Sequence, residues 1–137
     1  MPEGPEVKSM VLQLNNFLAG KTLNQIIIHS GRYSKKNPDN FQKFLEELPL
    51  KIEHVKNKGK FIWFEFENKW TMWNTLGMSG GWKLEKDKYS HCEFILEDGK
   101  NTIWFSDVRN FGTLKFCKDD KEFEKKIKSL GPDVLED

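Results

Sequence analysis

The sequence contains few cysteines, and they do not have the spacing of a metal site. Cys92 and Cys117 are the two cysteines in 137 residues, and two thiolates cannot complete the four-ligand shell of a structural zinc ion. The sequence also lacks a run of about 18 apolar residues and a basic amino-terminal segment, the patterns of membrane spans and signal peptides. These absences predict an intracellular protein in a reducing setting, without membrane association and without a metal or other cofactor in this chain.

Arginine is also scarce. Arg32 and Arg109 stand among 22 basic residues, which oppose 21 acidic residues and leave a formal net charge of +1. This near-neutral balance excludes a whole-chain polycation of the histone kind, but it leaves room for a local basic face. The composition, with 37% hydrophobic residues, 11 Phe and 5 Trp, is typical of one globular domain with a substantial core.

The hydrophobic pattern predicts helices at both ends of a run of strands. An apolar stripe of helical spacing follows Pro5, a strand is expected at residues 22–29 and a loop at residues 30–37, and a short helix begins near Phe41 and stops before Pro49. Aromatic and β-branched runs between glycine-containing turns predict strands at residues 61–66, 70–76, 91–96, 102–105 and 113–116. A last helix ends at Gly131. The predicted class is α+β, a two-layer antiparallel β-sandwich with flanking helices.

The opening residues suggest a reactive amine. Pro2 follows the initiator methionine, which is normally removed before a small residue, and the mature chain would then begin with a secondary amine. Such an amine can attack a carbonyl-like carbon and form an iminium, and its pKa of about 7.7–8.0 keeps a useful fraction neutral. Glu3 and Glu6 stand beside it, so one carboxyl group can protonate a leaving oxygen while the other orients the amine. Ordinary capping of the first helix is the alternative explanation of the same residues.

Five short motifs resemble, in order along the chain, those of the formamidopyrimidine-DNA glycosylase and endonuclease VIII family. They are Pro-Glu-Gly-Pro-Glu at residues 2–6, Lys-Gly-Lys-Phe-Ile-Trp at 58–63, Leu-Gly-Met-Ser-Gly at 76–80, Phe-Ser-Asp-Val-Arg-Asn-Phe-Gly at 105–112 and Leu-Gly-Pro-Asp-Val-Leu at 130–135. The opening motif favours the endonuclease VIII-like branch, whereas the Leu-Gly-Met-Ser-Gly turn is shared with the formamidopyrimidine branch.

The resemblance implies four catalytic residues. Pro2 would attack C1′ of a damaged nucleotide from the start of the amino-terminal helix, Glu3 would help to open the sugar and release the base, and Glu6 would support them. Lys60 would contact the phosphate near the lesion and assist proton transfer during elimination. An ordinary solvated lysine, within the basic segment that includes Lys56 and Lys58, is the alternative for Lys60.

The resemblance also implies a set of DNA contacts. Met78, Arg109 and Phe111 would fill the space left by the extruded nucleotide, and His91 would lie near the DNA. Asn110 stands where many members carry a second arginine, so a phosphate contact there would be neutral and weaker. Turn or core packing remains the alternative for Met78 and Phe111, and a solvent-facing position without a function remains the alternative for His91.

These features predict half of a DNA repair enzyme. Residues 1–131 would form the amino-terminal catalytic domain, and residues 132–137 would begin a linker to a missing helix–two-turns–helix and finger module, the place where a zinc ion could bind. The expected protein is a monomeric, DNA-associated glycosylase and AP lyase that excises oxidised bases from double-stranded DNA or cleaves abasic sites, with weak or no activity in this chain alone. The alternatives are a non-catalytic module that binds damaged DNA and a small β-sandwich that binds another ligand or protein.

Overall fold

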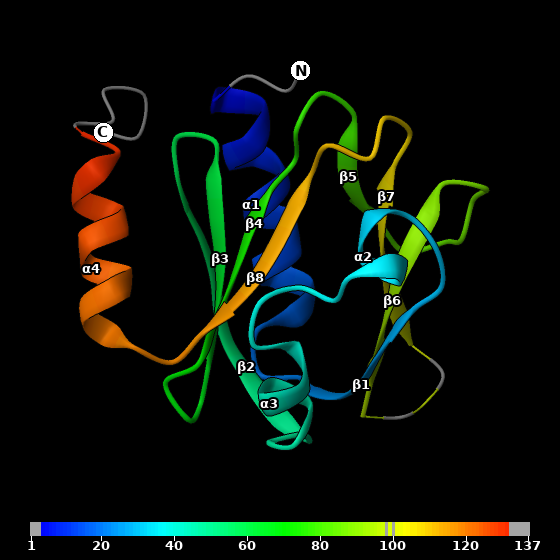
Figure 1. The fold of residues 1–137 in the computed structure, drawn as a ribbon, viewed down its shortest axis with the longest axis horizontal. Coiled ribbons are helices and arrows are strands. Elements are labelled where there is room, and N and C mark those ends of the chain that lie inside the picture. The colour runs from blue at the N-terminus through cyan, green and yellow to red at the C-terminus, as the bar shows by residue number, and fades with distance from the viewer. Residues whose placement is uncertain (1–3, 98, 100, 132–137) are drawn as a thin grey trace.

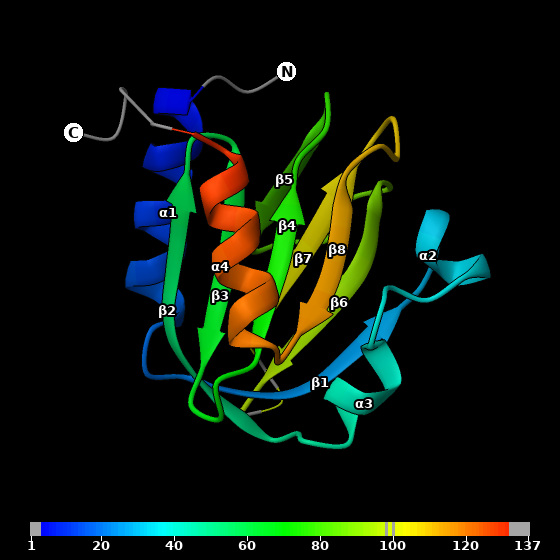
Figure 2. The same ribbon diagram turned by 60° about the vertical axis from the view of Figure 1, so that its left-hand side comes forward.

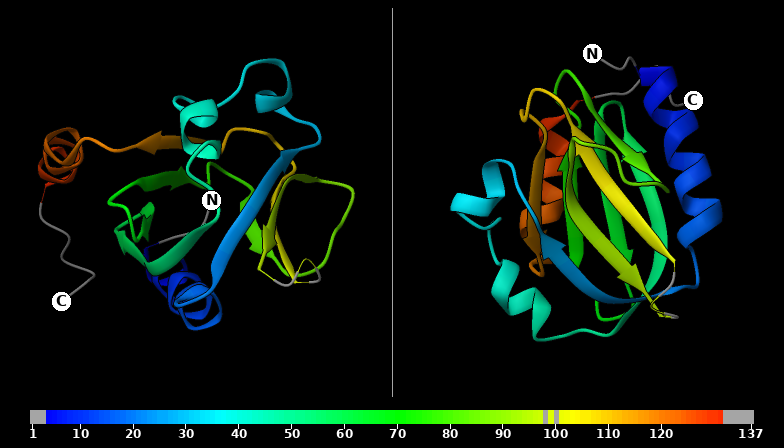
Figure 3. Two further views of the ribbon diagram at one scale, coloured as in Figure 1. Left: turned by 90° about the horizontal axis from the view of Figure 1, so that it is seen from below. Right: turned by 90° about the vertical axis from the view of Figure 1, so that its right-hand side faces the viewer.

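Strands make up the centre of the molecule and pair antiparallel in one continuous order. The computed structural model describes residues 4–97, 99 and 101–131, and within these residues it contains eight strands in the order β5-β7-β6-β1-β2-β3-β4-β8. Their bounds are β1 (Thr22–Ile28), β2 (Leu50–Lys58), β3 (Phe61–Phe66), β4 (Thr71–Thr75), β5 (Gly80–Lys83), β6 (Ser90–Leu96), β7 (Thr102–Asp107) and β8 (Thr113–Cys117). β1 meets β2 through a short pairing of Thr22 with Lys51 and Leu23 with Leu50. The sheet folds over at this pairing into two layers that face each other (Figure 3).

Helices flank the sandwich, as the sequence predicts. They are α1 (Gly4–Leu18), α2 (Arg32–Lys35), α3 (Phe41–Leu45) and α4 (Asp120–Ser129). The buried side of α1 is formed by residues three or four positions apart and packs along β2 (Figure 2), and its members are Val7, Val11, Leu14 and Leu18. α4 lies over β3 and β4, where Phe123 and Ile127 contact the cluster of Phe61 and Trp73. No helix in the described ranges is long and apolar enough to cross a membrane.

Trp82 of β5 is the central aromatic side chain between the two layers. Its ring lies 5.2 Å from the ring of Phe64 on β3, in the layer of β2, β3, β4 and β8, and 5.0 and 5.1 Å from those of Phe94 on β6 and Phe105 on β7, in its own layer of β5, β7, β6 and β1. Its indole N–H donates to Oδ1 of the fully buried Asn74, at 3.0 Å. Aromatic side chains with a satisfied polar group contribute a large part of core stability, so Trp82 joins the layers by apolar contact and by a hydrogen bond.

The predicted α+β sandwich is confirmed, with differences at three elements, β2, β5 and α2. β2 was not predicted because its alternation breaks at an irregularity in register, where the exposed Glu53 and His54 both stand between the buried Ile52 and Val55. β5 was missed because its four residues include two glycines, which disfavour strands. The predicted loop at residues 30–37 contains the short helix α2.

The connections at one end of the sandwich carry most of the predicted site residues. The first turn of α1, the β2–β3 turn, the β4–β5 connection and the β7–β8 connection lie together at the top of Figure 1. The sheet order brings about this placement, because β4 and β8 are neighbours and β5 and β7 are neighbours. The β4–β5 and β7–β8 connections are therefore held next to each other.

Candidate nucleic-acid interface

A buried carboxylate joins the β4–β5 connection to the β7–β8 connection. Asp107, the last residue of β7, is 2% exposed. Its Oδ1 accepts from the hydroxyl of Ser79 at 2.5 Å, and its Oδ2 accepts from the backbone N–H of Gly112 at 2.7 Å. The Ser79 oxygen in turn accepts from the backbone N–H of Arg109 at 2.8 Å. Hydrogen bonds to an ionised group are stronger than neutral ones, so these contacts hold both connections in one arrangement.

Two glycines allow the connections to approach closely. Gly77 has a φ of +63°, and a Cβ placed on it would lie 2.9 Å from the backbone nitrogen of Gly112. A Cβ on Gly112 would lie 2.7 Å from the ring of Phe105 and 2.9 Å from the backbone oxygen of Thr75. A side chain at either position would have to push the neighbouring backbone or ring away. The close approach of the two connections therefore requires glycine at both positions.

The side chains at the tips of these connections point to solvent. Met78 is 50% exposed, Phe111 is 58% exposed and the neighbouring Val108 is 57% exposed, and Arg109 is also exposed. Core packing is thereby excluded for Met78 and Phe111. Large apolar side chains grouped on a protein surface mark an interaction site, and here they stand on a firmly braced backbone beside a guanidinium group.

His91 lies directly behind the β7–β8 connection. Its Nε2 is 2.8 Å from the backbone oxygen of Asp107, and its Nδ1 is 2.8 Å from the hydroxyl of Ser30. A carbonyl oxygen only accepts, so Nε2 carries the proton, and in the neutral ring Nδ1 accepts from Ser30. The side chain is half-buried on the face of β6 opposite to Cys92 and Phe94. The predicted alternation of β6 is confirmed, and both ring nitrogens of His91 have protein partners.

Arg32 and Asn110 connect the α2 segment to the same loop. The Nη1 group of Arg32 donates to the backbone oxygens of Phe111 at 3.4 Å and Gly112 at 3.3 Å, and its guanidinium lies 5.2 Å from the ring of Tyr33. The backbone N–H of Arg32 donates to Oδ1 of Asn110 at 3.0 Å. Asn110 has a φ of +62°, a conformation that asparagine tolerates better than most residues. Asn110 thus uses its side-chain oxygen to hold the loop.

Lys60 and Glu6 lie at the same end of the molecule but on other elements. Lys60 is exposed in the turn between β2 and β3, and Glu6 is exposed in the first turn of α1. A carboxylate in the first turn is favoured by the helix dipole. Pro2 and Glu3, the other two predicted catalytic residues, lie outside the described residues. The structure therefore brings the predicted DNA contacts together and places Lys60 and Glu6 at the same end.

A second carboxylate, Asp87, organises the neighbouring β5–β6 connection. It accepts from Lys83 Nζ at 2.6 Å, from the Ser106 hydroxyl at 2.7 Å and from the backbone N–H of Tyr89 at 2.9 Å. These bonds, led by the one from Lys83, hold the pKa of the Asp87 carboxyl far below its usual range. Asp87 thus stays ionised beside the strand that ends in Asp107. Within the described residues, no group of three or more His, Cys, Asp or Glu side chains could hold a metal ion.

Three residues of this interface were not identified from sequence. Asp107 and Ser79 belonged to recognised motifs, but nothing in their spacing showed that the two side chains meet. Arg32 lies 77 positions before Arg109 in the sequence, and only the pairing of β1 with β6 places it beside the loop. The scarcity of arginine was the one available signal for Arg32.

The sequence matches known proteins along nearly its whole length. The family model of the formamidopyrimidine-DNA glycosylase N-terminal domain matches residues 1–114. A formamidopyrimidine-DNA glycosylase of Bacillus cereus is 34% identical over 143 aligned positions, which cover 99% of this chain and 51% of that protein. One of Lactobacillus johnsonii is 34% identical over 140 positions, 97% of this chain and 49% of that protein. The chain thus spans about half the length of these curated relatives.

Solved structures show the same fold. A Lactococcus lactis Fpg mutant bound to DNA containing Fapy-dG superposes with a TM-score of 0.79 at 23% identity, over 93% of this chain and 47% of that one. MutM in complex with DNA containing carbocyclic 8-oxo-G gives a TM-score of 0.78 at 22% identity, over 93% of this chain and 48% of that one. The family model covers most of the sequence, and the five motifs stand in the family's order. The chain therefore belongs to the formamidopyrimidine-DNA glycosylase N-terminal domain family.

Proposed function

We propose that this chain is the amino-terminal half of a DNA glycosylase and AP lyase that acts on double-stranded DNA with oxidised bases or abasic sites. The main support is the group of Met78, Arg109 and Phe111, which stand exposed on two connections that Asp107 braces. The curated relatives are named as glycosylases, and the matching structures hold lesion-containing DNA. The protein would be associated with DNA and monomeric.

The proposed reaction begins with the amine of Pro2. Its nitrogen attacks C1′ of the damaged nucleotide, the bond from C1′ to the base breaks, and the base leaves with a proton. Glu3 protonates the sugar ring oxygen as the ring opens, and the nitrogen and C1′ form an iminium. A proton is then lost from C2′ and the C3′–O3′ bond breaks, which is β-elimination. Glu6 would support the amine, and Lys60 would hold the phosphate beside the lesion and assist the proton transfer.

The exposed loop side chains would stabilise the DNA while the nucleotide is outside the helix. Extruding a nucleotide costs roughly a few kcal/mol in lost stacking and pairing. Met78 can enter the vacated space as an apolar wedge, Phe111 can stack against a base, and Arg109 can hydrogen-bond to the base left without a partner. Since their backbone is held in advance by Asp107, little ordering cost remains at binding. His91 and Asn110 would support this surface from behind the loop.

The domain boundaries are part of the proposal. Residues 1–131 would form the catalytic domain, and residues 132–137, which lie outside the described residues, would start the linker to a second half. That half would supply most of the positive charge that grips the duplex, and a zinc ion, if present, would bind there, with no cofactor in this chain. On its own this chain would then bind DNA weakly and turn over slowly or not at all.

The mechanism is tested by trapping the iminium with borohydride on duplex DNA that contains an abasic site, with the protein at its natural length. A covalent adduct is expected for the wild type, and Pro2→Gly, which keeps an amine but loses the proline ring, should trap poorly. Equal trapping by Pro2→Gly would contradict the role of Pro2. Salt-dependent binding without any adduct would instead support the alternative, a non-catalytic module for damaged DNA. Intact mass spectrometry would show whether Met1 is removed, since a retained methionine blocks the amine.

The branch within the family leads to a separate proposal about the lesion. The opening Pro-Glu-Gly-Pro-Glu supports an endonuclease VIII-like preference for oxidised pyrimidines along with ring-opened purines, although the relatives above carry the formamidopyrimidine name. Excision rates on matched duplexes with an oxidised pyrimidine, a formamidopyrimidine or 8-oxoguanine would distinguish the two branches. Faster excision of 8-oxoguanine than of the oxidised pyrimidine would contradict the proposed branch.

A further inference from the structure

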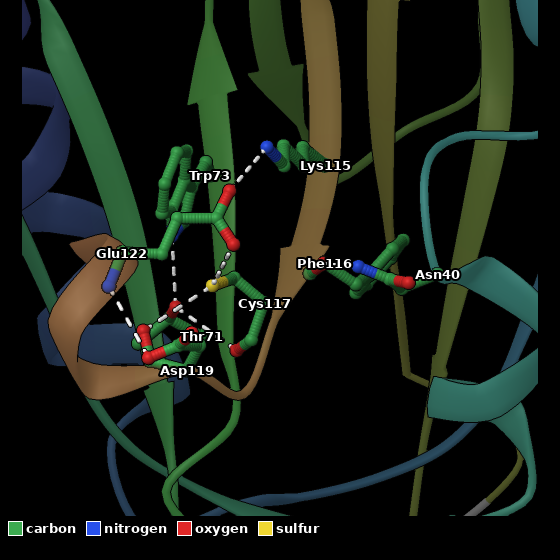
Figure 4. A network of polar contacts seen from close by, with 8 residues as sticks. All are labelled: Asn40, Thr71, Trp73, Lys115, Phe116, Cys117, Asp119 and Glu122. Atoms are coloured by element: carbon green, nitrogen blue, oxygen red, sulfur yellow. Dashed lines mark hydrogen bonds and ion pairs between the residues drawn. The ribbon is translucent and has the colours of Figure 1, made fainter. Parts of the chain in front are cut away.

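A groove of about 650 Å³ runs along β8 between the α2–α3 segment and α4. Figure 2 shows α4 on one side of β8 and α2 and α3 on the other. The basic residues among its lining are Arg32, Lys36, Lys115 and Lys126, and Asp39 is the acidic one. Glu122 of α4 pairs with Lys115 at 2.7 Å (Figure 4). Four basic side chains therefore face two carboxylates in a chain whose overall charge is nearly balanced.

Aromatic rings hold three of these cations in place. Nζ of Lys115 lies 4.9 Å from the ring centre of Trp73, and Nζ of Lys126 lies 5.3 Å from that of Phe61. The guanidinium of Arg32 lies over Tyr33, as described above. A cation over a ring is attracted to the ring face and keeps its full charge. Because Lys115 is already paired with Glu122 and Arg32 already donates to backbone oxygens, Lys36 and Lys126 supply the positive charge of the groove that a ligand can use.

The groove begins where the interface described above ends. Arg32 lines the groove and also donates to the backbone oxygens of Phe111 and Gly112. Thr75 and Thr113, the residues at the ends of β4 and β8 next to the two connections, line it as well, and their hydroxyls are 2.6 Å apart. A strand held at the tips of the connections would therefore meet Arg32 and the two threonines where the groove begins.

We propose that this groove binds the sugar-phosphate backbone of a single DNA strand that leaves the duplex next to the lesion. The proposal rests on the proposed function, since a DNA substrate brings the strand to Arg32. The volume is typical of a site for small ligands, which range from about 300 to 1,000 Å³, so the groove can enclose a nucleotide or two of one strand and is too small to enclose a duplex. Its excess of positive charge matches phosphates, and its continuity with the interface favours a strand over a free nucleotide.

The test measures the salt dependence of binding of 5′-phosphorylated tetrathymidylate to the wild type and to a Lys36→Ala/Lys126→Ala variant. Each lost phosphate contact lowers the slope of log K against log salt by about 0.7 on a single strand. The variant should lose about 1.4 from the slope. Extrapolated from equal binding at 1 M salt, this corresponds to roughly 25-fold weaker binding at 0.1 M salt. The matched control is Lys86→Ala/Lys88→Ala on the β5–β6 connection, whose lysines also lie over rings, at 5.7 and 5.1 Å from those of Trp104 and Tyr89.

The outcomes separate the groove from the glycosylase proposal. An unchanged slope in the Lys36→Ala/Lys126→Ala variant, or an equal loss in the control, would overturn the groove proposal. Tight binding of thymidine 5′-monophosphate, equal to that of the tetranucleotide, would also overturn it. Borohydride trapping of a blunt abasic duplex at saturating DNA should stay at the wild-type level in both variants. Failure of the wild type to trap would count against the proposed function and not against the groove.

Discussion

Replacing Asp107 by asparagine should destabilise the fold, although the two side chains have nearly the same shape. The carboxylate serves two donors at once, the Ser79 hydroxyl at 2.5 Å and the Gly112 N–H at 2.7 Å. An amide has one accepting oxygen, so one of these donors would face an NH₂ group. If the amide oxygen keeps Gly112, the NH₂ group faces the Ser79 oxygen, which can accept from it beside Arg109 N–H only if the hydroxyl hydrogen turns away from position 107.

The magnitude follows from what is lost. A hydrogen bond to a charged group contributes about 1.5–3 kcal/mol and a neutral one about 0.5–1.5 kcal/mol, and Asp107→Asn makes both contacts neutral and leaves the Ser79 hydroxyl hydrogen without its acceptor. We expect the free energy of unfolding to fall by roughly 2 kcal/mol. Ser79→Ala removes the other end of the same contact, so the double variant should show a coupling of about 0.5–3 kcal/mol between the two positions.

Urea unfolding followed by tryptophan fluorescence measures these differences, with Glu85→Gln on the exposed β5–β6 connection as the control of equal charge change. Surface substitutions usually change stability by less than about 0.5 kcal/mol. If Asp107→Asn also stays within that limit, or if the two substitutions add without coupling, the carboxylate does not brace the connections and the reasoning fails.

Three further substitutions or reactions test other parts of the structure. Gly112→Ala should lose about 1–3 kcal/mol of stability because its Cβ would lie 2.7 Å from Phe105, whereas Gly81→Ala, with nothing within 4 Å of its Cβ, should change stability little in the same thermal unfolding assay. Asp119→Ala should cost about 1 kcal/mol, because its carboxylate caps α4 by accepting from two backbone N–H groups, and amide hydrogen exchange should show faster opening of that helix. Cys92, whose pKa burial raises to about 12, should resist alkylation by iodoacetamide at pH 8 in the native protein and react after denaturation.

The parts of the fold that were predicted from sequence are those with a strong local pattern. β3 was predicted with its exact bounds because Phe61–Phe66 is aromatic, and α1 was predicted because its apolar residues recur at helical spacing. β2 and β5 were missed because a break in alternation and glycine, respectively, weaken the local signal. The pairing of β1 with both β2 and β6 has no local signature, since register depends on contacts between distant segments.

The candidate site divides in the same way. Met78, Arg109 and Phe111 were named from their motifs, and their exposure agrees with a surface role. The residues that hold them in position could not be predicted in this way. A supporting hydrogen bond needs two residues, and only the folded chain shows which two side chains meet. The hydrogen bond between Asp107 and Ser79 joins residues 28 positions apart, and the one from Arg32 to Phe111 joins residues 79 positions apart. Sequence motifs thus predicted the exposed residues of the proposed DNA contact, but not the residues that hold them in position.

The two arginines show why the scarcity of this residue matters. Arg32 donates through Nη1 to two adjacent backbone oxygens, and its guanidinium carbon lies 5.2 Å from the ring centre of Tyr33; a delocalised guanidinium packs on an aromatic ring more readily than a lysine ammonium does. Arg109 stands on the outer side of the same loop, where a guanidinium can pair with a base edge. The lysines elsewhere supply positive charge, which requires no fixed geometry. Both arginines therefore lie at one loop, where Arg32 supports the backbone and Arg109 is the one proposed to contact DNA.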